Sequence, residues 1–410
     1  MPSTEATRLF RARTVVPVIR SPIDDGGVAV RDGKILAVGM WNDLIREYSS
    51  AIIEDLGECI LLPGFINAHC HLDYTMMRGA ITGGKSFSAW IQRLNAIRRS
   101  LDQADYLAAI SAGIDELRMW GCTTVLNIES FPELIPLLPT PAIRVINFLE
   151  VMDIRSRLHS EEALAGAINF SGQAVGGSGG LGISPHAPYT ASRELYDLVR
   201  LFARKYALPI CTHLAESDEE ISMFTRGDGP LHDFLRSIGR PMEDCRGVTP
   251  VQALLSDGLL PEGSLLVHMN FLDGEDRSLL RRLAGIYPVI HCPRTHAFFG
   301  RPRFDLGFFR DAGIPVLLGT DSLASNQDLN MFAELRAMRS SFPDLDPGEI
   351  LAMATIRPAA AIGHAGLLGE LSPGAVADFL AIPDEGGDGS PAERVLANRV
   401  PPRIWISGHS

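Results

Sequence analysis

The sequence predicts an α/β fold, a (β/α)8 TIM barrel accompanied by a small β-sandwich formed by both chain ends. From about residue 60 onward, apolar segments of strand length alternate with segments of helical pattern, which is typical of a parallel sheet. Eight such strand-and-helix units favour a barrel that closes on itself. Short extended segments at both ends of the chain predict the sandwich. A doubly wound parallel sheet is the alternative fold.

The predicted sandwich combines segments that lie far apart in the chain. The first sixty residues contain short extended segments, separated by turn signals such as Asp32-Gly33. The tail after Gly366 returns to short extended pieces, notably Asp378–Ile382 and Arg403–Ile406. We therefore expect residues 1–60 and 366–410 to form one composite β-sandwich, and residues 61–365 to form the barrel.

Eight strands are predicted in the barrel region, several of them apolar throughout, as expected where both faces of a sheet are covered. They are Ile60–Ala68, Thr123–Ile128, Ile143–Glu150, Gly180–Ser184, Leu208–His213, Ser264–Met269, Ile286–Cys292 and Pro315–Thr320. The helices predicted between them include Phe87–Arg99, Asp105–Trp120, Arg193–Tyr206, Asp276–Ala284 and Leu329–Ser340.

The composition indicates a globular protein that binds neither nucleic acid nor a membrane. Of 410 residues, 46% are hydrophobic and 21% charged, and the net charge of −12 would repel nucleic-acid backbones and anionic membranes. No apolar run is long enough to span a bilayer. The six cysteines are scattered without a CxxC pair, which favours a reducing compartment. The N-terminus lacks the pattern of a signal peptide, so we expect a cytoplasmic protein.

The motif His69-Cys70-His71 ends the first predicted barrel strand. Residues two apart in a strand point to the same side, so both imidazoles face one direction. Such a pair suits a divalent transition metal. Alternatively, two histidines at a strand end can stack and hydrogen-bond to the backbone, and the pair alone does not decide between these interpretations.

The later strands end in residues of the same types. The active site of a β/α barrel forms at the C-terminal ends of its strands. Six of the eight predicted strand ends carry histidine or aspartate, namely His69 with His71, His186, His213, His268, His291 and Asp321. Histidines scattered through a core would not follow strand ends. The pattern therefore predicts a metal site.

Two carboxylates extend this predicted site. Glu216 lies three residues beyond His213, where a carboxylate can take a proton from metal-activated water. It can also be a helix N-terminal carboxylate, because Ser217-Asp218-Glu219-Glu220 is typical of a helix start. Asp321 follows a buried strand, and taken alone it favours a helix cap. Beside a metal, its anionic oxygen would complement three neutral nitrogens.

Three segments together resemble the amidohydrolase superfamily, in particular its branch of cytosine deaminases, adenosylhomocysteine deaminases and triazine hydrolases. They are Pro63-Gly64-Phe65-Ile66-Asn67-Ala68-His69-Cys70-His71-Leu72-Asp73, Thr212-His213-Leu214-Ala215-Glu216 and Leu318-Gly319-Thr320-Asp321-Ser322. The resemblance covers nearly the whole chain, in the right order. It implies a distorted β/α barrel with a small β-sandwich built from both termini, in agreement with the pattern of segments.

The resemblance also implies roles for these residues. The implied metal ligands are His69, His71, His213 and Asp321. The implied catalytic residues are Glu216 as proton shuttle, His268 orienting the attacking water or the substrate, and Asp321. Binuclear members of the superfamily use a carbamylated lysine at the fourth strand, whereas here that strand ends near His186 with no lysine nearby. A single divalent ion is therefore implied, zinc or alternatively iron.

The implied reaction is hydrolytic deamination of an amino-substituted N-heterocycle. A divalent ion lowers the pKa of its water, Glu216 carries the proton to a ring nitrogen, and ammonia leaves a ring carbonyl behind. A hydrolase of the same scaffold could instead expel chloride, as in triazine hydrolysis, or open a cyclic amide. A non-catalytic relative would be expected to have lost ligands, whereas all of them are present here.

The segment from His291 to Arg303 bears on the identity of the substrate. Its three arginines and two phenylalanines suggest an aromatic ligand with an anionic group. Alternatively, the arginines pair with surface acids or with the other subunit of a homodimer. The residues expected to contact the substrate are His186, His291, Arg294, Trp90 and Phe298.

Two loops narrow the choice of substrate. Ribose-binding deaminases of this branch place an acidic residue after an Arg-Gly pair, but residues 78–85 contain none. The loop with His291-Cys292-Pro293-Arg294 resembles aminodeoxyfutalosine deaminases, whose substrate joins an aminopurine to a benzoate. Aminodeoxyfutalosine is therefore the leading candidate substrate.

Overall fold

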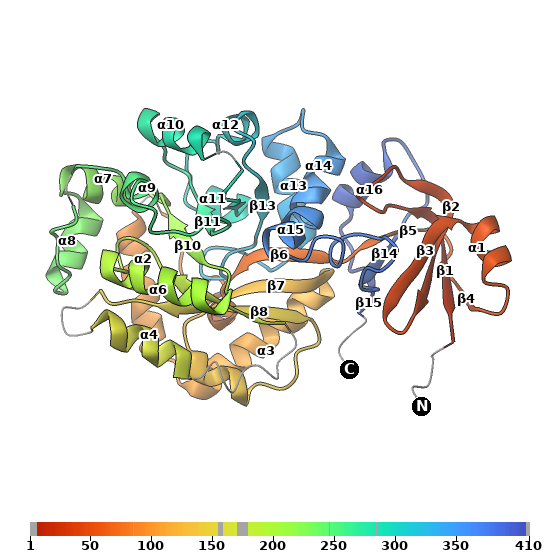
Figure 1. Cartoon of the computed structure of the whole chain (residues 1–410), viewed down its shortest axis with the longest axis horizontal. Coiled ribbons are helices and arrows are strands. Elements are labelled where there is room, and N and C mark those ends of the chain that lie inside the picture. Colours follow the sequence, from red (N-terminus) through yellow and green to blue (C-terminus); the bar gives the residue numbers. More distant parts are fainter. Residues whose placement is uncertain are drawn as a thin grey trace.

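The computed structural model describes residues 6–84, 86–154, 159–169, 179–245, 247–283 and 285–406. Within these ranges the chain forms one seven-stranded sheet and two four-stranded parallel sheets. Figure 1 shows the seven-stranded sheet at one end of the molecule, on the same side as both marked chain ends, with the parallel sheets and most helices beside it. The fold is therefore a mixed α/β fold with parallel sheets.

The seven-stranded sheet joins the two ends of the chain. Its strands are β1 (Arg8–Val15), β2 (Ile23–Arg31), β3 (Lys34–Met40), β4 (Ile52–Asp55), β5 (Cys59–Pro63), β14 (Phe379–Pro383) and β15 (Arg403–Trp405). The order is β15-β14-β5-β1-β2-β3, with β4 also paired to β1. Phe10 and Phe379 meet edge to face in its core, with ring centroids 4.9 Å apart. The described strands of both ends belong to this one sheet, so the sandwich and its residue boundaries stay predictions.

Each of the eight strands predicted for the barrel region has a counterpart in the parallel sheets, although the first begins later than predicted. One parallel sheet contains β6 (Phe65–Cys70), β7 (Cys122–Glu129), β8 (Arg144–Val151) and β9 (Leu181–Pro185); the other contains β10 (Cys211–Leu214), β11 (Leu265–His268), β12 (Val289–His291) and β13 (Val316–Leu318). A parallel bridge joins Ile183 to Ile210. On the opposite edges, the N–H groups of Thr320 and Asp321 donate to the carbonyl of His69 at 3.1 and 3.0 Å. Because no continuous strand ladder joins the two parallel sheets at either junction, a closed barrel also stays a prediction.

Helices follow most of these strands, and the five predicted ones are present. The helical elements of this region are η1 (Leu72–Met77), α2 (Phe87–Arg98), α3 (Gln103–Met119), η2 (Pro132–Leu137), α4 (Ser160–Asn169), α6 (Arg193–Tyr206), α7 (Asp218–Arg226), α8 (Pro230–Ser237), α9 (Pro250–Leu255), α10 (Gly274–Arg282), α11 (Pro293–Phe298), α12 (Leu306–Asp311), α13 (Met331–Ser341), α14 (Pro347–Met353) and α15 (Ile356–Ala361). The remaining helices, α1 (Trp41–Glu47) and α16 (Pro391–Ala397), accompany the terminal segments. Helix α6 shows why they form: its buried residues Leu195, Val199 and Ala203 recur every four positions and make one apolar face.

Two expectations about the whole chain can be compared with the structure. No described helix is both long and apolar enough to cross a bilayer. All six cysteines, which lie in the described ranges, are free.

The predicted strand Ile60–Ala68 is interrupted at Gly64, and this part of the prediction is wrong. Pro63 ends β5, and the N–H of Gly64 turns away to donate to the carbonyl of Asp378 at 3.0 Å. A Cβ at Gly64 would lie 2.2 Å from the side chain of Thr123. The close approach allows the chain to pass directly from the terminal sheet into the first parallel strand.

We predict that Gly64→Ala destabilises the protein by about 1–3 kcal/mol, because Thr123 and the backbone would have to shift to admit the methyl group. Urea unfolding measures the effect. Gly39→Ala in β3 is the matched control, since a Cβ at Gly39 meets nothing within 4 Å. Equal unfolding midpoints for the two variants would contradict the role assigned to Gly64.

Candidate functional site

Five of the predicted strand-end residues meet at one point. His69 is the penultimate residue of β6 and His71 lies just beyond this strand, His213 and His268 lie in β10 and β11, and Asp321 follows β13. All five are buried, with exposed fractions between 0% and 7%. The Nε2 atoms of His71 and His213 are 3.3 Å apart. Asp321 Oδ1 lies 3.7 Å from His69 Nε2 and 3.9 Å from His71 Nε2.

The backbone is bent where these side chains enter the site. Ala215, His268 and Asp321 have φ angles of 52°, 79° and 58°, in the left-handed region that few residues other than glycine adopt. Asp321 is also not a helix cap, since α13 begins ten residues later and Asn330 caps it. Its Oδ1 instead accepts the N–H of Ser322 at 2.6 Å. The alternative interpretation of Asp321 as a cap is therefore wrong.

The protonation states of this cluster suit a divalent metal. Burial lowers the pKa of His69, His71 and His268, which keeps these imidazoles neutral. Burial alone would raise the pKa of Asp321, but the surrounding histidines, His69 foremost with His268 and His71, more than offset this effect and lower that pKa. Neutral nitrogens beside an ionised carboxylate are the donors that zinc prefers.

Unpartnered ring nitrogens point to the same conclusion. Both nitrogens of His69 and Nδ1 of His71 are buried and make no hydrogen bond within the part of the chain that the structure describes. Such groups are rare unless a metal or water completes them. The donor atoms of His69, His71 and Asp321 lie within 4.8 Å of one another. His213 shares the cluster: its Nδ1 donates to the carbonyl of His186 at 2.8 Å, so Nε2 is the ring nitrogen that faces the cluster, 3.3 Å from Nε2 of His71. The residues therefore fit a divalent transition metal such as zinc.

Glu216 lies beside this cluster and outside the helix that follows it. Helix α7 begins at Asp218 and is capped by Ser217, so Glu216 is not a first-turn residue. Its Oε1 lies 3.6 Å from His268 Nε2 and 3.0 Å from Arg301 Nη2. Burial raises the pKa of Glu216, while the charge of Arg301 opposes that increase. The carboxylate is therefore placed to accept and release a proton.

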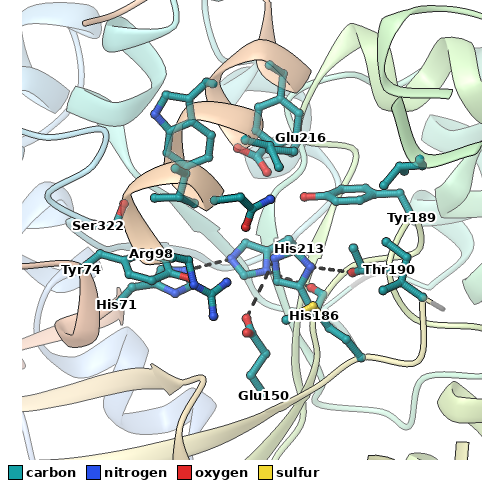
Figure 2. Close-up of a pocket in the computed structure, with 18 of the residues that line it drawn as sticks. His71, Tyr74, Arg98, Glu150, His186, Tyr189, Thr190, His213, Glu216 and Ser322 are labelled. Carbon is teal, nitrogen blue, oxygen red and sulfur yellow. Dashed lines mark hydrogen bonds and ion pairs between the residues drawn. The ribbon is translucent and has the colours of Figure 1, made fainter. Parts of the chain in front are cut away.

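Three of the metal-ligand candidates, His71, His213 and Asp321, line one cavity of about 250 Å³. Its residues near the cluster are His71, His186, His213, Glu216, His268, Asp321 and Ser322; its apolar wall includes Phe87, Trp90, Ile91, Leu94, Met152, Ile154, Phe234, Leu235 and Ile238. Figure 2 shows Glu216 on one side of the imidazoles and Glu150 on the other. A cavity with one polar side and one apolar side fits a heterocycle with an apolar extension.

The predicted substrate contacts divide into two groups. His186 and Trp90 line the cavity, whereas His291, Arg294 and Phe298 are not among its described lining residues. The His291 ring stacks on Phe304 at 4.0 Å, and the Phe298 ring packs against Phe299.

Arg294 contacts acidic side chains and is not among the described residues that line the cavity. Its guanidinium contacts Asp328 at 2.5 Å and lies 3.8 Å from Glu334 Oε1. For Arg294, these contacts therefore favour the alternative interpretation, pairing with acidic residues, over contact with the substrate.

The sequence prediction did not include three polar residues in or next to the site, namely Arg98, Glu150 and Arg301. Arg98 is the only lysine or arginine among the described residues that line the cavity. It lies on α2 four residues beyond Leu94 and eight beyond Trp90, and this spacing could have identified it. Glu150 follows the same strand-end rule as the histidines. Arg301 lies in an irregular segment that gives no periodic signal.

We predict that the buried carboxyl of Glu334 makes stability depend on pH. Burial raises its pKa from 4.5 to about 8, although the charge of Arg294 opposes this increase. Between pH 4.5 and about 8, the folded state therefore keeps a proton that the unfolded state has released. The stabilisation is complete below pH 4.5 and is lost as the pH rises toward 8. Glu334→Gln, which imitates the protonated carboxyl, should make the melting temperature depend less on pH over this range. The exposed Glu275→Gln should leave the profile unchanged, and a wild-type profile in Glu334→Gln would contradict the prediction.

Known proteins resemble this chain in sequence. A model of the amidohydrolase family matches residues 60–408. An aminodeoxyfutalosine deaminase from Deinococcus radiodurans is 32% identical over 345 residues, which cover 81% of this chain and 80% of the relative. A 5-methylthioadenosine/S-adenosylhomocysteine deaminase from Pyrococcus furiosus is 28% identical over 368 residues, covering 87% of this chain and 81% of the relative.

Solved structures show the same fold at lower identity. Helicobacter pylori aminofutalosine deaminase, in complex with methylthio-coformycin, superposes with a TM-score of 0.84 at 22% identity, covering 97% of this chain and 98% of the other. A zinc-bound adenosine deaminase from Xanthomonas campestris gives a TM-score of 0.79 at 22% identity, covering 98% and 92%. These similarities support the arrangement of the strands that carry the site.

Proposed function

Because the chain belongs to the amidohydrolase family, we propose that it is a metal-dependent hydrolytic deaminase of an aminopurine nucleoside. The observation that carries the proposal is that the buried carboxylate of Glu216 lies beside the histidine cluster and ionised Asp321. Glu216, His71, His213, His268 and Asp321 all line one cavity. Water would enter the reaction and ammonia would leave it. A ring carbonyl, whose oxygen comes from the water, replaces the exocyclic amino group.

The ligands in this proposal are those implied by the family resemblance. They are His69, His71, His213 and Asp321, holding a single divalent ion, zinc or alternatively iron. The ion, when bound, supplies a positive charge that lowers the pKa of a water molecule. The neutral state of His69 and His71 and the ionised state of Asp321 support this assignment.

The chain's own residues would then move the proton. Glu216 accepts a proton from the attacking water and delivers it to the ring nitrogen next to the carbon that bears the amino group. His268, whose Nε2 lies 3.6 Å from Glu216 Oε1, orients the same water. His186 and Trp90 would contact the heterocycle from the cavity wall.

The proposed substrate is aminodeoxyfutalosine, an aminopurine nucleoside that carries a benzoate. Two observations support this choice over a small nucleoside. The relative from D. radiodurans bears this activity in its name and is 32% identical. The apolar wall of the cavity can receive a second aromatic ring, and Arg98 supplies a cation for its carboxylate.

A panel of substrates tests the proposal. Protein of measured metal content is incubated with cytosine, guanine, adenosine, methylthioadenosine and aminodeoxyfutalosine, and released ammonia is quantified. We expect ammonia from the aminopurine nucleosides, with aminodeoxyfutalosine giving the highest kcat/KM. Chloride release from a chlorotriazine without ammonia release from the panel would favour a hydrolase instead. No ammonia from any member, with the metal bound, would refute deamination.

The two parallel sheets are further proposed to form one distorted barrel. An apolar cluster that includes Ala68, Phe148, Val267 and Leu317 draws on strands of both sheets, which supports their facing each other. The bridge between Ile183 and Ile210 supports one junction. A crystal structure should show parallel pairing continue from β9 to β10 and from β13 to β6; two open sheets separated along either junction would refute the barrel.

A further inference from the structure

We infer that Arg301 is a positioning residue for Glu216, fixing one oxygen of its carboxylate so that the other remains available to the substrate. The inference rests on the proposed function, in which Glu216 carries the proton. It assigns a role to a residue that lies outside the metal ligands and outside the described lining of the cavity.

The contact between the two side chains is direct. Arg301 Nη2 donates to Glu216 Oε1 at 3.0 Å, and the arginine side chain is only 5% exposed. His268 Nε2 approaches the same oxygen at 3.6 Å. Within the described residues, Oε2 of Glu216 makes no hydrogen bond, although Glu216 lines the cavity. One oxygen is therefore held and the other is free to receive a proton.

Aromatic rings hold the guanidinium group in place. Its central carbon lies 4.4 Å from the ring centroid of Phe299 and 5.8 Å from that of Phe87. A planar guanidinium on aromatic faces has few orientations available, which a flexible ammonium would not share. The direction of the donated hydrogen bond is therefore fixed before the substrate arrives.

The ion pair between Arg301 and Glu216 does not use all the hydrogen-bond donors of the buried guanidinium group. Nη1 of Arg301 is buried and has no hydrogen-bond partner in the described ranges. Buried charges that serve stability are usually completed by hydrogen bonds on all sides, because their desolvation is costly. A pair that leaves a donor unsatisfied, directly behind the proposed proton carrier, is better explained by the orientation it imposes on Glu216.

A fixed carboxylate matters because the same group must meet the water and then the ring nitrogen. The backbone of Glu216 is already held, since its N–H and that of Ala215 donate to the carboxylate of Glu220 at 2.7 and 3.2 Å. Arg301 would restrict the remaining rotation of the side chain. Displacing a catalytic group by about 1 Å can cost about 100-fold in rate.

The test compares steady-state kinetics of Arg301→Met, Arg301→Lys and the wild type on an aminopurine nucleoside. We expect Arg301→Met to lower kcat by about 100-fold while KM changes less than about 3-fold, because the substrate is still bound. Arg301→Lys, which keeps the charge and one donor, should fall between Arg301→Met and the wild type. Elemental analysis should show that all three proteins hold the same amount of metal.

Arg303→Met is the matched control. Arg303 lies two residues further along, is exposed, and covers the ring of Phe342 at 4.5 Å rather than the site. Its kcat should equal that of the wild type.

The outcomes separate this inference from the proposed function. An active wild type with an equally active Arg301→Met would overturn the inference alone, as would a raised KM with unchanged kcat or a loss of metal. If Arg301→Met does not fold, Arg301→Lys decides by the same kcat and KM criteria. An inactive wild type would refute the proposed function, and the inference with it.

Discussion

Replacing Glu216 with glutamine is expected to lower kcat by about 1,000-fold while the protein keeps its metal. Glutamine has nearly the same shape, but it can neither accept the proton of the attacking water nor deliver it to the ring nitrogen. General acid–base groups typically contribute between about 100-fold and about 10,000-fold to a rate. Because Glu216 is not one of the proposed ligands, the metal site should be unaffected.

The measurement is ammonia release by Glu216→Gln beside elemental analysis of the same sample. Glu275→Gln, an exposed residue of α10, serves as the control and should behave as the wild type. Turnover near the wild-type rate in Glu216→Gln would remove Glu216 from the mechanism. Loss of metal would show that Glu216 is a ligand rather than a proton carrier.

Replacing Asp321 with asparagine is expected to abolish activity by a different route, through loss of the metal. Asp321 supplies the anionic oxygen of the proposed ligand set, and its ionised state is favoured by the histidines around it. Changes to residues that merely support a ligand typically cost between about 10-fold and about 100-fold in metal affinity. Loss of a ligand itself should therefore weaken binding by at least about 100-fold.

Competition with a chelator measures this affinity directly, without any substrate. Asp344→Asn, at an exposed position outside the site, is the control. We expect metal content and ammonia release to fall together in Asp321→Asn and neither to fall in the control. Wild-type metal affinity in Asp321→Asn would exclude Asp321 from the ligand set.

The sequence was sufficient to predict the cluster because parallel strands impose a shared direction. The carboxyl ends of such strands lie at one edge, so His69, His213, His268 and Asp321 had to meet once their strands were identified. The eight strands could be identified because they are apolar and regularly spaced by helices. Gly64 escaped prediction because its role depends on Thr123, a contact across the fold.

Residues in irregular segments could not be placed in the same way. Arg294 and Arg301 belong to one short stretch, yet the first contacts Asp328 and the second contacts Glu216. Helix α11 ends at Phe298, and Gly300, with a φ of 62°, redirects the chain between the two arginines. Which arginine reaches the site is set by this turn and by aromatic contacts that no periodic pattern records.

The most direct test of hydrolytic deamination is to run the reaction in isotopically labelled water with metal-loaded protein and an aminopurine nucleoside. Mass spectrometry of the product and an ammonia assay are performed on the same sample. We predict one labelled oxygen in the ring carbonyl for each ammonia released, and both signals to form about 1,000-fold more slowly with Glu216→Gln. Unchanged nucleoside in every metal-loaded sample, or ammonia release without labelled oxygen in the product, would contradict the account.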